Sequence, residues 1–527
     1  MILSHKGLWM KIIVVFLLVA ANMFGVDGAA GHMVEVLPKV DIGKKLYDTH
    51  CAVCHHPDRI GLDGPPLHKK SLRSYKVGVL SDKIKNGFPQ TLMPKYEFLN
   101  PYELLQIARY IKKPLDQNII WDKKDIDGSL TTFKDRPNPL NIQDIEQVLP
   151  VVEREGDKVW VMEGEKILSK FHLDHVHGGI KYTMNKENYG EFIFVPTRDG
   201  WVQKYSLKTG KREPKIRACI NLRNLSISKD GKNLLTTCLL PKQLVISDIK
   251  SMKTKKIVPL DGKVSALYEF YSKDRAMWTY RDKPLIGMLD TKTLDISYIK
   301  IEEPIEDFFI EPFEEFIIAT SRGGKSMKVL ELKDFKVVFE ESMEGMPHLF
   351  SATYWYNDGQ FYFATPHIRK PYVTVWQMFD WKLVKQINTG GDGFFVKTHP
   401  YTPYLWADNG TDELVLIDKQ TYKKTILTPR KGKQYIHTEY SGDGKLAYLS
   451  LYEADGEIVV LDTKTQKELV TYKANIPVGK YNFVNKNRRF YPRLFGQTIY
   501  EQNTKNTKKL NDYEKRSLKA YKDSIKK

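Results

Sequence analysis

The sequence VLDTKTQK at Val460–Lys467 is one copy of a unit that recurs through the C-terminal part of the chain. In each copy a short β-rich run ends in a polar turn that is followed by Lys or Thr. The copies are centred on Ser206, Asp248, Asp290, Leu332, Met378, Asp418, Asp462 and Gln502, in steps of 42, 42, 42, 46, 40, 44 and 40 residues. This period and this strand content match one four-stranded propeller blade. We therefore predict an all-β propeller of eight blades over residues 151–515.

The two ends of this propeller are less regular than its middle. We expect the first blade to take a strand from the segment Val159 to Leu168. Seven blades is the alternative arrangement, if Ile499 to Leu510 only closes the ring instead of completing a blade.

Length and composition bound the rest of the chain. Its 527 residues are too many for one ordinary core, so at least two domains are expected. With 42% hydrophobic and 28% charged residues, the chain belongs to the folded, globular class. Asp, Pro and Asn are frequent in residues 116–150, without a sustained period, and we predict this segment to be an interdomain linker.

The chain is basic, with 82 Lys and Arg against 64 Asp and Glu and a formal net charge of +18. The basic residues are scattered and are densest from Lys505 to Lys527, where residues 516–527 are predicted to be a basic tail. No recognition helix or RNA-binding signature accompanies them, so no nucleic acid partner is expected. An anionic ligand or an acidic partner is favoured instead.

A second motif lies near the N-terminus. Cys51-Ala52-Val53-Cys54-His55 has the C-x-x-C-H spacing of covalent c-type haem attachment, in which both thiols bond the vinyl groups and the imidazole ligates the iron. We therefore predict one covalent haem c, held by Cys51, Cys54 and His55. Residues 38–115 are predicted to form an all-α domain of the class I cytochrome c type.

Two helices and a loop complete the predicted cytochrome domain. A short helix from Ile42 to His50 leads to the haem motif, and an amphipathic helix from Pro101 to Lys112 closes the domain. Met93 precedes a proline in the loop before the closing helix, and we predict it to be the sixth iron ligand. An ordinary core methionine is the alternative, and the rival ligands are His50, His56 and His68.

The first thirty residues have the pattern of a Sec signal peptide. Lys6 and Lys11 precede the apolar run from Ile12 to Phe24, which ends in small residues. A single uncleaved anchor is the alternative, although the run is short for a full membrane span. Export agrees with c-type haem attachment, and the resemblance of this part of the chain to bacterial cytochromes implies the periplasm.

Two cysteines are not used by the haem motif. Cys219 and Cys238 form a disulfide in one interpretation, because an oxidising compartment permits it. In the other interpretation they are two buried thiols. The sequence leaves both open.

Histidines are scarce in the predicted propeller. They are His172, His175, His177, His348, His367, His399 and His437. Three of them, His177, His348 and His437, occupy corresponding positions at the beginning of an inner strand. Equivalent positions in successive blades face the same channel, so these three side chains are candidates to converge on one ligand. A structural histidine is the alternative for each.

Several further motifs carry a resemblance. They are HGG at His177, Thr197–Gly200, Arg223-Asn224, GMPHL around His348, ATPH, GFFVKTHP and PVGKYN at Pro477–Asn482. Together with the C-x-x-C-H motif, they resemble the cytochrome cd1 family over nearly the whole mature chain. GMPHL, ATPH, GFF and TPYLWADNGTDELVLIDK are more similar to the NirN-type dihydro-haem d1 dehydrogenases than to the nitrite reductases. The His-Asp-Gly-Gly and Phe-Val-His-Pro stretches of the reductases are not recognisable here.

This resemblance implies a function. It implies a propeller of the haem d1 type that oxidises a propionate of dihydro-haem d1 to the acrylate of haem d1 and passes the electrons to haem c. The tetrapyrrole is then substrate and product, a periplasmic protein accepts the electrons, and a cytochrome cd1 nitrite reductase is a candidate recipient of haem d1. A nitrite reductase, or a non-enzymatic haem d1 carrier, is the alternative.

The resemblance also implies roles for individual residues. His348 is the candidate base, since a neutral histidine has a pKa near working pH, and Tyr481 is a neighbour that positions the propionate or assists proton transfer. His177 and His437 are candidate axial ligands to the d1 iron. Arg198 and Arg223 are candidates to bind the carboxylates, since Arg offers bidentate geometry. Weaker candidates are Arg322 and Lys397.

Overall fold

The structure is a computed structural model that describes residues 41–526. Within this range it leaves out residues 62–63, 70, 74, 88–92, 116–117, 177, 322–325 and 504–508. The predicted signal segment 1–30, His177 and Arg322 lie outside the described residues. No helix within the described part of the chain is long and apolar enough to span a membrane.

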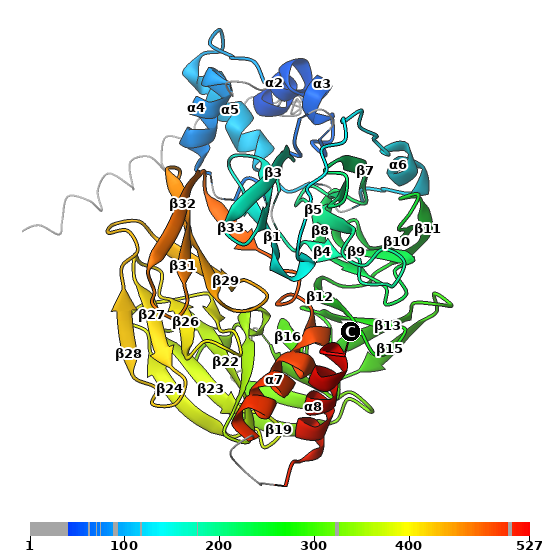
Figure 1. Ribbon diagram of the computed structural model, residues 1–527. Coiled ribbons are helices and arrows are strands. Elements are labelled where there is room, and N and C mark those ends of the chain that lie inside the picture. Colours follow the sequence, from blue (N-terminus) through cyan, green and yellow to red (C-terminus); the bar gives the residue numbers. More distant parts are fainter. Residues whose placement is uncertain are drawn as a thin grey trace, which may run out of the picture.

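The N-terminal module is a small bundle of helices (Figure 1). Its helices are α2 (Ile42–His50), α3 (Ala52–His55), α4 (Val77–Asn86) and α5 (Pro101–Ile111). Asn100 and Glu103 form a capping box at the start of α5, whose first residue is a proline. Leu104, Ile107 and Ala108 are buried on its inner face, as predicted from the amphipathic pattern. The sequence-predicted all-α domain is therefore confirmed.

Helices α2 and α5 approach each other closely at Gly43. A Cβ atom at Gly43 would lie 2.4 Å from the carbonyl oxygen of Gln106 in α5, so a larger residue would push the helices apart. This contact fixes the start of α2, the helix whose other end, at His50, leads into the haem motif.

Eight sheets arranged in a ring follow the cytochrome module, which confirms the predicted eight-bladed propeller (Figure 1). The first four blades are β33 (Pro477–Lys480) with β1 (Val148–Glu153), β2 (Lys158–Glu163) and β3 (Lys166–His172); β4 (Lys181–Tyr182), β5 (Phe192–Pro196), β6 (Trp201–Ser206) and β7 (Arg212–Arg217); β8 (Asn221–Ile227), β9 (Asn233–Leu240), β10 (Lys242–Asp248) and β11 (Thr254–Pro259); and β12 (Val264–Glu269), β13 (Arg275–Tyr280), β14 (Leu285–Asp290) and β15 (Ile296–Lys300).

The other four blades follow in chain order. They are β16 (Asp307–Ile310), β17 (Phe316–Thr320), β18 (Ser326–Glu331) and β19 (Val337–Ser342); β20 (Met346–Pro347), β21 (Thr353–Asn357), β22 (Gln360–Ile368), β23 (Tyr372–Gln377) and β24 (Leu383–Asn388); β25 (Val396–Lys397), β26 (Tyr404–Asp408), β27 (Leu414–Asp418) and β28 (Lys424–Leu427); and β29 (Tyr435–Tyr440), β30 (Leu446–Leu451), β31 (Gly456–Asp462) and β32 (Glu468–Ala474). Three short 3₁₀ helices are η1 (Ile145–Gln147), η2 (Leu349–Ser351) and η3 (Arg488–Phe490). The second and third strands of each blade are largely buried between neighbouring blades, and the outermost strands are the most exposed.

The ring closes by a pairing of distant segments. Strand β33 pairs with β1, with Val151 opposite Lys480, so the two ends of the propeller share one blade. The prediction of a last repeat at Gln502 is wrong, because this residue lies in helix α7 (Tyr491–Asn503). The eighth copy of the third strand is β2, which ends at Glu163, 43 residues before Ser206. The alternative in which Ile499 to Leu510 closes the ring is wrong for the same reason.

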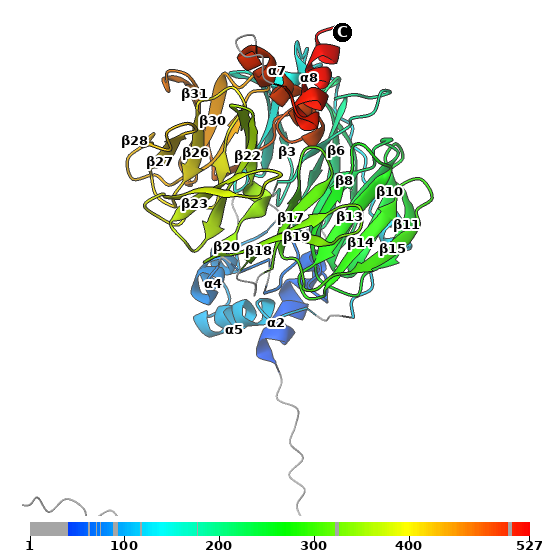
Figure 2. The ribbon, with the colours of Figure 1, turned by 90° about the horizontal axis from the view of Figure 1, so that it is seen from below.

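The chain ends in two helices packed on the propeller, α7 and α8 (Asp512–Ser524). Phe495 of α7 joins the propeller core, and Tyr513 of α8 stacks on Phe379 with ring centroids 3.8 Å apart. Propeller strands thus end at Lys480 rather than near residue 515, and the predicted basic tail is part of an amphipathic helix. Figures 1 and 2 place these helices and the cytochrome module on opposite sides of the propeller.

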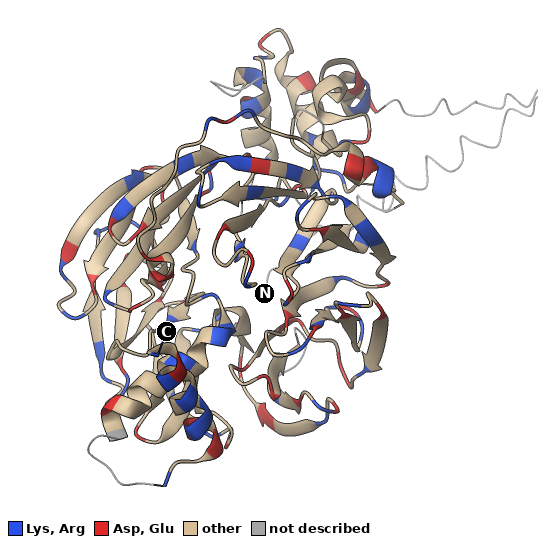
Figure 3. Ribbon diagram, turned by 45° about the vertical axis from the view of Figure 1, so that its right-hand side comes forward, with Lys and Arg blue, Asp and Glu red and all other residues tan. Residues whose placement is uncertain are grey.

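The segment that we predicted as a linker packs along the propeller. It contains helix α6 (Lys123–Gly128), whose Ile126 is fully buried, and it bridges to strand β7 through Thr131 and Lys215. Arg212 of β7 forms two hydrogen bonds of 2.9 and 2.8 Å with the carboxylate of Asp135. The segment therefore belongs to the propeller wall. Lys and Arg residues occur along the ribbon of both modules (Figure 3).

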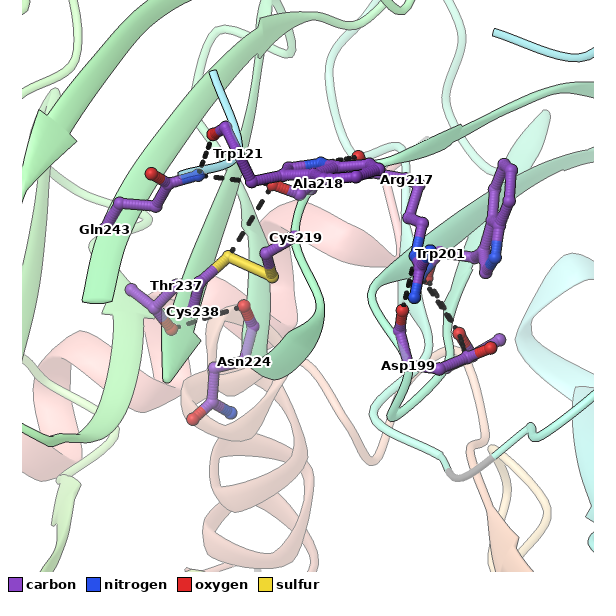
Figure 4. The surroundings of a disulfide bond; sticks show 11 residues. Trp121, Asp199, Trp201, Arg217, Ala218, Cys219, Asn224, Thr237, Cys238 and Gln243 are labelled. Atoms are coloured by element: carbon purple, nitrogen blue, oxygen red, sulfur yellow. Dashed lines mark hydrogen bonds between the residues drawn. A yellow bond between two sulfur atoms is a disulfide. The ribbon is translucent and has the colours of Figure 1, made fainter. Parts of the chain in front are cut away.

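Cys219 and Cys238 form a disulfide, which answers the question that the sequence left open. It joins the start of β8 to β9 (Figure 4). The bond closes a segment with a sequence separation of 19 residues. Loop-closure entropy of the unfolded chain predicts a stabilisation of about 3 kcal/mol for a loop of this size.

We therefore expect the free energy of unfolding of the double variant Cys219→Ala/Cys238→Ala to be about 3 kcal/mol lower than that of wild type. Denaturant titration followed by tryptophan fluorescence measures this difference. Wild type treated with a thiol reductant should fall to the level of the variant. Equal stability of oxidised wild type and the variant would contradict the expectation.

Candidate functional site

The C-x-x-C-H motif lies directly after helix α2. Cys51 and Cys54 both carry free thiols, and α2 ends where this motif begins. His55 is 7% exposed, and its Nδ1 lies 2.8 Å from the carbonyl oxygen of Pro65. Because a carbonyl oxygen only accepts, Nδ1–H is the donor and Nε2 keeps the lone pair that an iron ion requires.

Two further observations on His55 fit a haem ligand. Burial lowers its pKa, which favours the neutral, iron-binding form. A Cβ atom at Gly64 would lie 2.5 Å from Cε1 of His55, so this loop presses on the ring and only glycine permits it. The residues present therefore fit a c-type haem.

The second protein ligand of the haem c iron is less well defined than His55. Met93 is half-buried and packs against the core of the cytochrome module. Among the rivals, His50 packs edge-on against the rings of Tyr96 and Phe98, and His56 accepts a hydrogen bond from the backbone of Asp58. The assignment of Met93 stays a prediction.

Substitution of Met93 by alanine tests this assignment. A thioether ligand raises the haem potential, so the variant should have a lower midpoint potential, within the roughly 0.8 V range that axial ligands span. Potentiometric titration of the α-band measures this shift. An unchanged potential would show that another residue ligates the iron.

His348 lies at a break in the inner edge of its blade. Strand β20 ends at Pro347, directly before His348, and η2 follows. Both β20 and β21 pair with β22, so β21 continues the inner edge of the sheet after this break. The Nδ1 atom of His348 lies 2.9 Å from Oδ2 of Asp307, the first residue of inner strand β16 in the neighbouring blade. Oδ1 of Asp307 accepts the backbone N–H of Phe350 at 2.9 Å. Since a carboxylate accepts, Nδ1–H of His348 is the donor and Nε2 carries the lone pair.

His437 also lies at an irregularity of an inner strand. The pairing of β29 with β30 shifts its register between Ile436 and Glu439, and His437 has a φ of +51°. Such bulges re-aim a side chain and are frequent beside active sites. His437 is 7% exposed, and its Nδ1 has no hydrogen-bond partner among the described residues. Burial, and then the nearby cations Lys480, Lys486 and Lys397, hold its pKa well below the ordinary value. It is therefore neutral.

One aromatic ring connects the two histidines. The ring of Phe395 lies 6.2 Å from that of His348 and 4.8 Å from that of His437, centroid to centroid. Asp408 holds this segment by accepting backbone N–H groups of Phe395 at 3.0 Å and His437 at 3.3 Å. The structure thus brings together two of the three histidines that sequence position singled out, and His177 lies outside the described residues.

Three arginines from successive blades face the same region. Arg198 lies between β5 and β6, Arg223 in β8 and Arg281 after β13. Burial lowers the pKa of Arg198 to about 10, with the nearby Arg73 and Arg281 adding to the effect. Burial also lowers the pKa of Arg223 to about 9, again with repulsion from Arg281 and Arg198. Neighbouring guanidinium groups that destabilise each other suit a ligand with several carboxylates.

Arg223 is connected to His348 through shared neighbours. Its guanidinium lies 5.4 Å from the ring centroid of Phe350, and Phe350 makes an edge contact with His348 at 6.1 Å. Nε of Arg223 donates to the carbonyl oxygen of Ser265. The arginine group and the histidine pair therefore belong to one site.

Tyr481 lies on another side of this region. A Cβ atom at Gly178 would lie 2.1 Å from the Tyr481 hydroxyl oxygen, and Gly178 has a φ of +122° that only glycine readily adopts. This hydroxyl is therefore beside the loop that carries His177. Burial raises the pKa of Tyr481, and nearby Arg198 opposes the shift. Described contacts join Tyr481 to Arg198 and to the HGG loop rather than to His348.

Lysines form a second cationic group around His437. Burial and the neighbouring Lys486 lower the pKa of Lys397 to about 7. Lys480 is fully buried, and its ammonium donates to Oγ of Ser450. Lys486 pairs with Glu439 at 2.7 Å. The site therefore has cations on two sides, from the arginine group and from the lysine group.

Sequence reasoning missed several members of the site. Asp307 holds a histidine segment and Arg281 completes the arginine group, yet neither lies in a recognisable pattern. Asp408 was part of the TPYLWADNGTDELVLIDK stretch but had no assigned role. Phe395 was part of the GFFVKTHP motif but had no assigned role. Two other histidines are structural: burial lowers the pKa of His367 to about 4 and that of His399 to about 3.

Comparison with known proteins gives the same two-part organisation. Residues 143–486 match the family model "Cytochrome D1 heme domain", and residues 38–111 match "Cytochrome C oxidase, cbb3-type, subunit III". The chain is 31% identical to a dihydro-heme d1 dehydrogenase of Pseudomonas aeruginosa over 472 residues, which cover 84% of this chain and 94% of the relative.

Two other curated relatives and one solved structure are also similar. A nitrite reductase of Stutzerimonas stutzeri is 20% identical (84% of this chain, 92% of the relative), and Protein NirF of Pseudomonas aeruginosa is 22% identical (62% and 89%). The structure described as dihydro-heme d1 dehydrogenase NirN in complex with DHE is 30% identical, with a TM-score of 0.78. It covers 85% of this chain and 100% of its own.

Proposed function

The chain belongs to the cytochrome d1 haem domain family, and from this membership we propose that it is an oxidoreductase acting on dihydro-haem d1. In this proposal it converts one propionate side chain to the acrylate of haem d1. Its 31% identity to a dihydro-heme d1 dehydrogenase, against 20% to a nitrite reductase, supports this choice. The observation that carries it is the pair His348 and His437, which contact the same ring of Phe395, beside buried arginines.

The proposed reaction removes two hydrogens from adjacent saturated carbons, as two protons and two electrons. A c-type haem bound to Cys51, Cys54 and His55 supplies a one-electron acceptor. His348 is the proposed base: Asp307 holds its Nδ1–H, so Nε2 takes the proton and the carboxylate stabilises the imidazolium that forms.

Other residues orient the substrate in this proposal. Arg198 and Arg223 hold its carboxylates through charge-assisted hydrogen bonds. Arg281 adds to the positive electrostatic potential around these two arginines. His177 and His437 are the proposed ligands of the substrate's iron. Tyr481 positions a carboxylate from the side of the HGG loop.

The hydrogen bond from His348 to Asp307 also suits an axial ligand, since metal-binding histidines commonly donate their second N–H to a carboxylate. The neutral His437 then has the state that a base requires. The two assignments differ in a measurable way, because loss of an iron ligand changes the spectrum of the bound tetrapyrrole and loss of a base does not.

Location and partners belong to the proposal as well. A periplasmic location is supported by the disulfide, since disulfides persist in oxidising compartments. The electrons then pass to a periplasmic one-electron acceptor, and haem d1 passes to a cytochrome cd1 nitrite reductase. A fusion to a reporter that is active only in the periplasm tests the location.

Product analysis tests the proposed reaction. Purified protein loaded with haem c is incubated anaerobically with dihydro-haem d1 and an oxidant, and the extracted tetrapyrrole is identified by absorption and mass. We expect a product lighter by two hydrogens. Retention of unchanged substrate would indicate a carrier, and nitric oxide production from nitrite would indicate a reductase.

A further inference from the structure

Arg217 is a buried cation at the boundary of the two modules. It ends strand β7 and is 4% exposed. Its guanidinium donates to three backbone carbonyl oxygens: Gly61 at 2.9 Å, Ile60, and Asp199 at 3.0 Å. Two of these acceptors belong to the cytochrome module and one to the propeller. A single side chain thus bridges both modules.

On the cytochrome side, Arg217 holds the segment that follows the haem motif. The backbone N–H of Gly61 donates to the carbonyl oxygen of His55 at 3.0 Å. One of the two cytochrome residues that Arg217 binds, Gly61, is therefore tied directly to the haem ligand. A displacement of this segment would move His55 with it.

On the propeller side, Arg217 holds the loop that contains Arg198. Its acceptor Asp199 is the next residue, and the Asp199 carboxylate lies 3.2 Å from Nδ1 of His175, in the segment that leads to His177. Arg217 thus contacts one of the proposed tetrapyrrole-binding loops directly and the other through Asp199.

Trp121 and the disulfide lie beside Arg217 (Figure 4). Trp121 lies 5.2 Å from the guanidinium, and its indole N–H donates to the Arg217 carbonyl oxygen at 2.9 Å. The disulfide Cys219–Cys238 begins two residues later in the chain. Its neighbours Ile220 and Leu240 form an apolar cluster with Ile60 and Leu115. The segment bound by Arg217 is thus also held by apolar contacts.

We propose that Arg217 is a positioning residue for electron transfer between the two sites. It holds the haem attachment segment against the loops that bind the tetrapyrrole. The electron donor, dihydro-haem d1, and the electron acceptor, haem c, are thereby kept close together. This inference rests on the proposed function. Each acrylate formed releases two protons, which go to the base and to water. It also releases two electrons, which leave one at a time through haem c to an external one-electron acceptor such as ferricyanide.

Three variants of the full-length, haem c-loaded protein separate this role from general stability. Arg217→Met keeps the length of the side chain and removes its donors, and Arg217→Lys restores one charged donor. Arg212→Met is the matched control, because Arg212 lies in the same strand and binds Asp135 instead of the cytochrome module.

The first readout is hydrogen–deuterium exchange of backbone amides, which does not depend on activity. We expect Arg217→Met to increase exchange in residues 56–61 and 197–201, and Arg212→Met to leave both segments unchanged. Arg217→Lys should lie between Arg217→Met and wild type. Wild-type protection of both segments in Arg217→Met would overturn the proposed bridging role.

The second readout is the rate at which the α-band of reduced haem c appears after mixing with dihydro-haem d1. We expect this rate to fall by about 10- to 100-fold in Arg217→Met, as for other remote displacements of a reacting pair, with partial rescue in Arg217→Lys. The haem c midpoint potential should stay unchanged in all variants. A wild-type rate in Arg217→Met would refute the inference. Absence of any conversion in wild type would refute the proposed function instead, and the exchange data would then still decide whether Arg217 bridges the modules.

Discussion

Replacement of His348 by alanine is expected to lower kcat for dihydro-haem d1 oxidation by about 10²- to 10⁴-fold, the contribution of a positioned general base. The expectation follows from the hydrogen bond between Nδ1 and Asp307, which leaves Nε2 as the proton acceptor. Anaerobic turnover with an artificial electron acceptor measures the change. The bound tetrapyrrole should keep its wild-type absorption spectrum.

His172→Ala is the control for this substitution, because His172 lies at the exposed end of β3 and should keep wild-type turnover. Full activity in His348→Ala would contradict the base assignment. Loss of activity together with an altered spectrum would assign His348 to the iron. In that case His437→Ala should lose turnover while keeping the wild-type spectrum.

Replacement of Arg223 by methionine is expected to weaken binding of dihydro-haem d1 by about 10- to 100-fold, the effect of losing one charge-assisted hydrogen bond. Spectroscopic titration of the protein with the tetrapyrrole measures this change in Kd. The exposed residue Arg275 offers the control, and Arg275→Met should bind as wild type.

The change in Tm caused by Arg223→Met in the tetrapyrrole-free protein distinguishes a binding residue from a structural one. The pKa of Arg223 is lowered to about 9 in the fold, so its charged form opposes folding at neutral pH, and this penalty disappears only as the pH rises above that value. Removal of the charge relieves the penalty and offsets the lost hydrogen bond to Ser265. We therefore expect an unchanged Tm at pH 7. A large drop in Tm would indicate a structural role.

Local features of the fold were predictable from the sequence. The helix that begins at Pro101 has a capping box and an apolar face, both of which depend on residues within one helix. The spacing of third strands is likewise a local repeat, and it predicted the propeller. It reached eight blades only by counting Gln502, whereas the eighth third strand is β2. Ring closure is different, because it pairs β33 with β1 across nearly the whole domain. The turn-like composition around Gln502 gave no sign that this segment is helical.

The candidate site was predictable only where a residue type is rare. Histidines are scarce in the propeller, so His348 and His437 stood out, and the structure places both against the ring of Phe395. Aspartates are common, and Asp307 becomes distinctive only because inner strands of two neighbouring blades meet. The same holds for Arg217, because two of its three carbonyl partners lie in the other module.

The central claim is tested most directly by following both chromophores in one anaerobic reaction. Protein with oxidised haem c is mixed with dihydro-haem d1 in excess of the enzyme, without another acceptor, and the absorption spectrum is recorded with time. The account predicts that haem c becomes reduced while haem d1 appears, with one acrylate formed for every two haem c reduced. Formation of haem d1 with haem c remaining oxidised, or reduction of haem c with no change in the tetrapyrrole, would contradict it.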